Sequence, residues 1–311
     1  MTIHEHLSEY AGLRVATFGP EDKPPADAFT SPSSYAWAVR TEFDEEPFEE
    51  VWARFREQVD TSAITALIIG FWGAPYGDSD TDVGALLAEA APSFPALRSL
   101  FIGDIIMEES EISWIQPGDV TPVLKAFPGL ERFEVRGSEE VVLEPVEHHG
   151  LRTLRFESGG LPAGVARSVG ASDLPNLEHL DLWLGTGDYG GDTSPDDLAA
   201  LLSGERLPAL RHLGLQDSEI EDQVAAAVAG AAVVAQLETL ALGMGVLTDV
   251  GAESLLSGQP LTHLKRLDLS HHFLSDAMME RVRTSLDGVE VDLDDQNTPS
   301  NGEWFFVEIS E

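Results

Sequence analysis

The sequence lacks cysteine altogether, and it also lacks the short motifs of common catalytic sites. Without cysteine, disulfides, thiolate zinc sites and cysteine nucleophiles are all excluded. No Ser-His-Asp order, HExxH string or Walker A loop occurs in the chain. We therefore expect a protein that is not an enzyme and that carries no cofactor.

Basic residues and long apolar runs are also scarce. Only 18 residues are Lys or Arg against 55 Asp or Glu, which gives a formal net charge of −37. This charge is repelled by nucleic-acid phosphates and anionic membrane surfaces, so we expect neither as a partner. No apolar stretch approaches the ~18 residues of a membrane span, and the acidic start "MTIHEHLSEY" lacks a signal peptide's apolar run. These features predict a cytoplasmic protein.

What the sequence does contain is an internal repeat. The pattern L-x-x-L-x-L occurs in nine variant units spaced 21 to 33 residues apart, and helix-like segments ending near a proline precede most of them. Each unit predicts a short strand, a turn and an amphipathic helix, and such units must stack to bury their leucines. The units begin at Ile64, Leu97, Leu130, Leu151, Leu177, Leu210, Leu237, Leu264 and Leu286.

The repeat resembles that of leucine-rich repeat proteins over about residues 60–295. This resemblance implies an α/β solenoid of the ribonuclease-inhibitor-like class, with parallel strands on the concave face and helices on the convex face. One departure is that Ser218, Gly245 and His272 replace the usual Asn or Cys of the turn. Stretches such as "LDLWLGTGDYGGD" and "LTHLKRLDLSHHFLSD" further resemble a family of bacterial cytosolic leucine-rich repeat proteins, a resemblance that implies no particular reaction.

The two ends of the chain differ from the repeats. Residues 1–60 predict an N-terminal cap, with strands at 13–18 and 34–40 and an amphipathic helix at 45–59. The repeats then occupy residues 61–295. Residues 296–311 predict a C-terminal cap in which 304–310 forms a last strand.

Two histidine pairs raise the question of a metal site. His271 and His272 fall on the turn after the eighth unit, where Ser275 or Asp276 is expected to cap the next helix. The pair in "EHHG" at 147–150 lies just before a strand. We interpret both pairs as structural and predict no metal site.

For three other motifs, the sequence favours a structural role over ligand binding or catalysis. "GTGDYG" at 185–190 matches a dinucleotide fingerprint, but no helix begins at its third glycine, which favours a long loop. "DSDTDVGALLAE" at 78–89 has the acid spacing of a calcium loop, but Val83 replaces the required glycine. An acidic loop in which Thr81 or Asp82 caps a helix is the favoured interpretation. The carboxylates of "MEESEIS" at 107–113 are expected by chance in so acidic a chain.

Positions 2, 3, 5, 7 and 8 of each unit are expected to point away from the core. Position 2 alternates in sign from Arg98 to Asp287, and position 5 places Arg155 beside Asp181. Both patterns predict ion-pair ladders between neighbouring strands, which lie ~4.8 Å apart. Position 3 differs because its basic residues have no acidic residue at position 3 of the neighbouring repeats. Two long loops also carry aromatic residues. These side chains either anchor a partner at the surface or tuck under their own loops. The predicted partner-binding residues are therefore Arg132, His179, His212, Arg266, Trp72, Tyr76, Trp183 and Tyr189.

These observations predict a non-catalytic leucine-rich repeat module that binds a cytosolic protein. The alternative is a regulatory or substrate-presenting subunit of a modifying enzyme. A metal-dependent enzyme built on the acidic loops is the third and weakest hypothesis.

Overall fold

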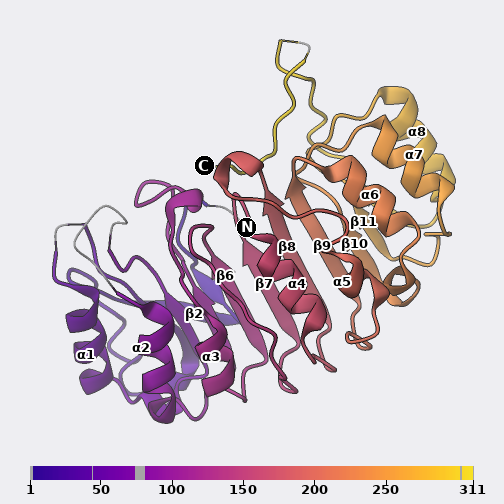
Figure 1. Ribbon diagram of the computed structural model, residues 1–311. Helices are drawn as coiled ribbons and strands as arrows, with labels where there is room; N and C mark the ends of the chain where they lie inside the picture. Colours follow the sequence, from indigo (N-terminus) through magenta and orange to yellow (C-terminus); the bar gives the residue numbers. More distant parts are fainter. Residues whose placement is uncertain (1–2, 44, 74–80, 302, 311) are drawn as a thin grey trace. The chain divides into compact units, whose positions relative to one another are not determined.

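The computed structural model describes residues 3–43, 45–73, 81–301 and 303–310 (Figure 1). It is a mixed α/β structure with an open, mostly parallel sheet whose twelve strands, β1 to β12, follow chain order. Eight α-helices occur in the described residues. The chain divides into two compact units: the first runs to residue 142 and adds 148–153, and the second comprises 143–147 and 154–310.

The first unit alternates strands with helices after an N-terminal hairpin. β1 and β2 are antiparallel, whereas β2 to β6 are parallel neighbours. The expected strands and helix of the N-terminal region are confirmed, with bounds within about three residues of those predicted. Its elements are β1 (Glu9–Tyr10), β2 (Leu13–Phe18), β3 (Tyr35–Val39), α1 (Phe48–Gln58), β4 (Ala66–Ile69), α2 (Val83–Ala90), β5 (Ser99–Ile102), α3 (Thr121–Ala126) and β6 (Arg132–Arg136).

The second unit repeats one strand and one helix more regularly, and β8 to β12 are all parallel. Its strands are β7 (Thr153–Glu157), β8 (His179–Gly185), β9 (His212–Ser218), β10 (Thr239–Ala241), β11 (Arg266–Asp268) and β12 (Glu290–Asp292). Its helices are α4 (Ala163–Ala171), α5 (Ala199–Ser203), α6 (Glu221–Ala229), α7 (Asp249–Ser257) and α8 (Asp276–Ser285).

The repeated leucines set the strand register and build the core. Leu180, Leu213, Leu240 and Leu267 are direct neighbours across β8 to β11, and each is at most 1% exposed. Because successive side chains of a strand point to opposite faces, these leucines all lie on the face that packs against the helices. Full burial of such a side chain contributes about 1.5–3 kcal/mol, so the repeat pattern fixes which face is the core.

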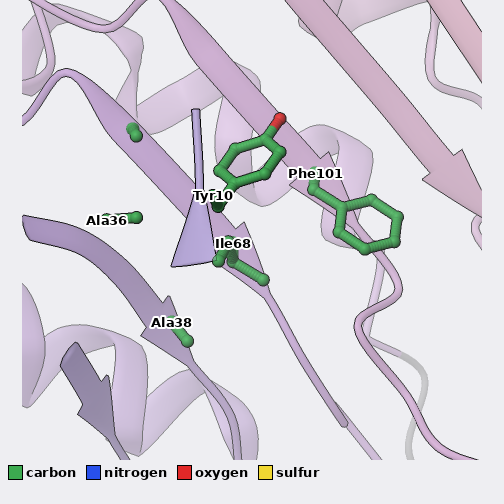
Figure 2. Packing of buried hydrophobic residues seen from close by; sticks show 6 residues of the cluster. Tyr10, Ala36, Ala38, Ile68 and Phe101 are labelled. Atoms are coloured by element: carbon green, nitrogen blue, oxygen red, sulfur yellow. The ribbon is translucent and has the colours of Figure 1, made fainter. Parts of the chain in front are cut away.

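The opposite face of the first unit is covered by the N-terminal segment. Tyr10 packs with Ala36, Ala38, Ile68 and Phe101 in a buried cluster, as Figure 2 shows. The Tyr10 and Phe101 ring centroids are 6.2 Å apart. The expectation that this face points away from any core is therefore wrong in the first unit, because a segment from the start of the chain folds back over it.

One residue fixes that segment in place through charge. His6 Nδ1 lies 3.5 Å from an Asp104 carboxylate oxygen, and its Nε2 lies 3.3 Å from Glu109. Partial burial lowers the pKa of His6, but hydrogen bonds to the two carboxylates outweigh it and raise the pKa to about 9. His6 is therefore a charged clamp between the N-terminal segment and the loop after β5.

Equivalent residues at the end of β9 and just after β10, β11 and β12 share one backbone conformation. Asp217, Met244, His271 and Asp295 occupy equivalent places and have φ values of 56°, 67°, 51° and 59°. His272, the next residue after His271, is fully buried. Its Nδ1 accepts from the Leu274 amide at 3.1 Å, so its Nε2–H donates to the Leu293 carbonyl at 3.2 Å. Burial lowers the pKa of His272, which keeps this imidazole neutral.

His148 of the first unit makes the same two kinds of contact, to the Leu151 amide and the Phe127 carbonyl. Each histidine thus bridges two backbone groups that the turn would otherwise leave unpaired. The structural role expected of His148 and His272 is confirmed, and His271 Nε2 lies 3.1 Å from the Phe306 carbonyl oxygen. Ser275 caps α8 by accepting from the Met278 amide, also as expected.

The C-terminal segment is not the strand predicted at 304–310. Trp304 forms an isolated bridge with Ser300, and no strand follows it in the described residues. The rings of Phe305 and Phe306 instead pack against Phe273, with centroids 5.0 and 5.4 Å away. In Figure 1 this segment is the yellow hairpin of the second unit. Its aromatic side chains therefore anchor it to the turn after β11 in place of strand pairing.

Within the described part of the chain, every helix is too short or too polar to cross a membrane.

Candidate functional site

The candidate site lies on the outward face of β8 to β11 in the second unit, the face opposite the leucines. His179, Asp181 and Trp183 alternate along β8, so all three point to this face. His212 and Gln216 come from β9 and pair in register with His179 and Trp183, respectively. Strand pairing therefore places five polar or aromatic side chains side by side.

Two of the predicted residues form a stacked pair. The imidazole centroids of His179 and His212 are 3.8 Å apart, and the ring planes differ by only 4°. His212 Nδ1 also lies 2.6 Å from Thr239 Oγ1 on β10. Position 3 of three consecutive repeats is thus one continuous row of contacts, as expected from its place in the pattern.

Asp181 is the buried centre of the site, with 6% of its surface exposed. Gln216 Nε2 donates to its Oδ1 at 2.6 Å, and Arg155 Nε lies 3.6 Å from its Oδ2. Gly214 leaves the space for this carboxylate, because a Cβ there would approach Asp181 Oδ1 to 2.3 Å. The predicted ion pair of Arg155 with Asp181 is confirmed.

Arg155 also links Asp181 to the aromatic residue of β8. Its Nε lies 3.1 Å from Glu157, and its guanidinium carbon lies 5.2 Å from the Trp183 ring centroid. A guanidinium over an indole face is attracted by the ring quadrupole. This contact holds Trp183 against the sheet, with only 3% of its surface exposed.

The tryptophans predicted as exposed anchors are therefore buried. Trp72 of the first unit is only 6% exposed, so its side chain is buried as well. Tyr189 is half-buried in a short 3₁₀ helix, Gly187–Tyr189. Tyr76 lies outside the described residues. Among the described aromatic candidates, only Tyr189 retains appreciable exposure.

The expectation that the position-3 arginines lack an acidic neighbour is wrong. Arg266 lies 2.7 Å from Asp292, 3.1 Å from Glu290 and 3.4 Å from Asp268. Arg132 of the first unit lies 3.5 Å from Glu134. Each arginine has an acid two residues further along its own strand, and such residues share a face of the sheet.

The position-2 ladder is only partly formed. Lys265 Nζ lies 2.6 Å from Glu238, as the alternation predicts. Arg98 and Arg211 instead donate to backbone carbonyls, including those of the preceding residues, Leu97 and Leu210. A long side chain at a strand edge thus finds a carbonyl as readily as a neighbouring carboxylate.

The electrostatics of His212 distinguish it from an ordinary surface histidine. Burial lowers its pKa, with the Asp181 carboxylate acting in the opposite direction and Arg155 adding to the lowering. The imidazole is therefore neutral at neutral pH. Its Nε2 is buried and has no hydrogen-bond partner among the described residues.

The dinucleotide-like motif is a loop, as expected. Gly185 and Gly190 have left-handed φ values of 68° and 92°, and the next helix, α5, begins only at Ala199. Gly185 also approaches the backbone of Gly159 so closely that a Cβ would lie 2.0 Å from its carbonyl oxygen. These glycines permit close backbone packing, which explains the motif without a phosphate.

The acidic motifs do not converge in the described residues. Asp82 caps α2 by accepting from the Ala85 amide at 2.8 Å, one of the two caps predicted. Asp78 and Asp80 of the calcium-like spacing lie outside the described residues. In the loop at 107–113, Glu109 accepts from the Ile106 amide and Glu111 accepts from Trp114 Nε1, so these two carboxylates have different partners.

Two comparisons found no similar protein. No family model matches the chain, and a search of curated proteins gives no match. Among solved structures, the chain is similar to a Bacteroides fragilis protein whose crystal structure comes from a structural genomics consortium. The two share 31% identity with a TM-score of 0.76, over 87% of this chain and 78% of that chain. At this identity and coverage, the chain belongs to the same family as the Bacteroides fragilis protein.

Proposed function

We propose that the chain is a leucine-rich repeat solenoid whose outward face binds a cytosolic protein without catalysing a reaction. The repeat itself supports the first part. Leucines of successive units are direct neighbours across β8 to β11, and equivalent positions at or just after the ends of β9 to β12 hold a left-handed residue. Each unit contributes one strand to a common face, as stacked repeats require.

One observation carries the binding function: a row of half-buried polar side chains crosses four neighbouring strands. His179, His212, Thr239 and Arg266 are in register on β8 to β11. Four strands spaced ~4.8 Å apart give a row about 14 Å long. Hydrogen-bonding groups spread along such a row suit the surface of a protein better than they suit a small metabolite.

The neighbouring contacts prepare these groups for recognition. Arg266 is oriented by Asp292, and His212 by Thr239, so neither side chain must be ordered when a partner binds. Side chains that are already ordered lose less conformational entropy on association. The surface can therefore bind through few residues.

A regulatory or substrate-presenting subunit of a modifying enzyme would use the same surface. The two functions differ in the partner and not in the site. If the bound protein is an enzyme, its activity should change on addition of the purified chain. If the activity of the enzyme does not change, the chain is a binding module that does not regulate its partner.

Site-directed photo-crosslinking tests the surface. A benzoylphenylalanine residue at Thr239 should crosslink a discrete protein in cells, whereas one at the exposed Glu280 of α8 should not. His179→Ala in the Thr239-labelled chain should lower the yield. The control is His263→Ala, which removes an exposed histidine that contacts the Val234 carbonyl. Crosslinking from Glu280 alone, or equal loss with His263→Ala, would move the site away from the outward face.

A further inference from the structure

We propose that His179, Asp181 and His212 form a binding site for a divalent transition-metal ion of the zinc type. This inference does not rest on the proposed function, and it departs from the expectation of no metal. Each of the three residues offers one ligand atom, and these atoms all lie within 4.8 Å of one another. Two imidazoles and one carboxylate are a ligand set that suits zinc and related metals and leaves a further position open.

The backbone of the sheet fixes the three residues. His179 and Asp181 are two residues apart on β8 and share its outward face. His212 is the direct neighbour of His179 in the parallel register of β8 and β9. A site built on paired strands holds its ligands more firmly than one built on loops.

The proton on His212 is directed away from the proposed metal. Its Nδ1 lies 2.6 Å from Thr239 Oγ1, so an Nδ1–H can donate to that hydroxyl. The lone pair is then on Nε2, which is buried and has no hydrogen-bond partner among the described residues. A buried acceptor without a partner costs free energy, and a metal ion would satisfy it.

Asp181 is oriented in the same manner. Gln216 Nε2 donates to Oδ1 at 2.6 Å, and an ion at Oδ2 would take the place of Arg155 Nε, which lies 3.6 Å from that oxygen. Metal-binding carboxylates are commonly held by such a second contact. Arg155 lies between Asp181 and Glu157, so this part of the face carries two carboxylates for one guanidinium and still favours an added cation.

Binding requires a small movement of the two rings. In a tetrahedral zinc site the ligand atoms are about 3.4 Å apart, because each lies ~2.0–2.1 Å from the ion. The present rings stack in parallel with centroids 3.8 Å apart, so their in-plane lone pairs do not yet converge. Loading therefore requires the His179 ring to turn about χ2, while the Thr239 contact keeps Nε2 as the ligand atom of His212.

The test uses the purified full chain after chelator treatment. Titration with Zn²⁺ in a calorimeter should give one site with a micromolar or tighter Kd, and Co²⁺ should develop the visible absorption of a tetrahedral centre. Asp181→Asn and His212→Ala should each weaken binding at least tenfold. Thr239→Val, which removes only the orienting hydroxyl, should weaken it by about 10–100-fold, the range for second contacts of metal ligands. His263→Ala is the control and should bind Zn²⁺ as the original chain does.

X-ray absorption of the zinc-loaded original chain uses no variant, so its result does not depend on whether a variant folds. The expected spectrum contains scattering from two imidazole rings. Oxygen-only coordination, absence of a stoichiometric site, or equal Zn²⁺ affinity in His212→Ala and His263→Ala would each overturn the proposal. Weak binding of several ions by the acidic surface would give that oxygen-only result.

Discussion

Replacing Glu221 by Gln should stabilise the protein at neutral pH and should do so less as the pH falls. Glu221 is the first residue of α6 and is 0% exposed, and neither carboxylate oxygen makes a hydrogen bond of normal geometry among the described residues, although the nearby Ser218 backbone acts to lower its pKa. Burial raises the pKa of Glu221 well above 4.5, and the nearby Asp217 raises it further. Folding at neutral pH must therefore protonate this group or bury its charge, and both cost free energy.

The sign of the pH dependence follows from this raised pKa. Below pH 4.5 the carboxyl group is protonated in both states, and its ionisation does not oppose folding. As the pH rises from 4.5 toward the folded-state pKa, only the unfolded state loses the proton. The free energy of unfolding of the original chain then falls relative to the Gln variant by up to about 1.4 kcal/mol per pH unit. For a domain of this size, 1 kcal/mol corresponds to about 2–4 °C in Tm.

Urea unfolding followed by circular dichroism between pH 4.5 and 8 would measure this difference. Across that range, the free energy of unfolding of Glu221→Gln should rise steadily relative to that of the original chain. The exposed control Glu280→Gln should show no such rise. A constant difference, or a Gln variant that is less stable at every pH, would refute the argument that a buried ionisable carboxyl opposes folding here.

Three further predictions concern contacts outside the site. His6→Gln should lower Tm more at pH 7 than at pH 10, because a raised histidine pKa stabilises fully below 6.5 and this stabilisation is lost as pH rises through about 9. Gly185→Ala should cost at least about 1–2 kcal/mol in urea unfolding, since its φ is left-handed and its Cβ would meet a backbone oxygen. Lys265→Glu should lower Tm slightly at low salt by facing Glu238, and Tm should recover in high salt. A loss of Tm that does not depend on pH would contradict the argument for His6. An unchanged free energy of unfolding would contradict the argument for Gly185. A loss of Tm that does not depend on salt would contradict the argument for Lys265.

The sequence was sufficient to predict the elements that depend on local pattern. The leucine spacing located the strands of the second unit, because a buried leucine every second position requires one face of a strand. For β12 the predicted register is wrong by two residues, since Leu267 pairs with Val291 and not with Val289. The cap at Ser275 and the turn at His272 followed from their places after a strand and before a helix. These features depend on residues a few positions apart, and composition and spacing report such contacts well.

The features that sequence reasoning missed depend on contacts between distant segments or along one strand. The N-terminal segment covers the outward face in the first unit, and His6 of this segment contacts Asp104, which is 98 residues away. No local sequence pattern predicts a contact over that distance. The acids beside Arg266 were visible in the sequence, because Asp268 is two residues further on the same face. Comparing only equivalent positions of different repeats hid this pair. The gathering of Asp181 with His179 and His212 was hidden in the same way.

Radical footprinting of the chain, with and without the protein captured by crosslinking, tests the central claim that the outward face of β8 to β11 binds a partner. Oxidation at His179 and His212 should fall when the partner is bound. Oxidation of Met279, a half-buried residue of α8, should stay the same. Protection of Met279 with unchanged oxidation at both histidines would contradict the claim and place the partner on the helices.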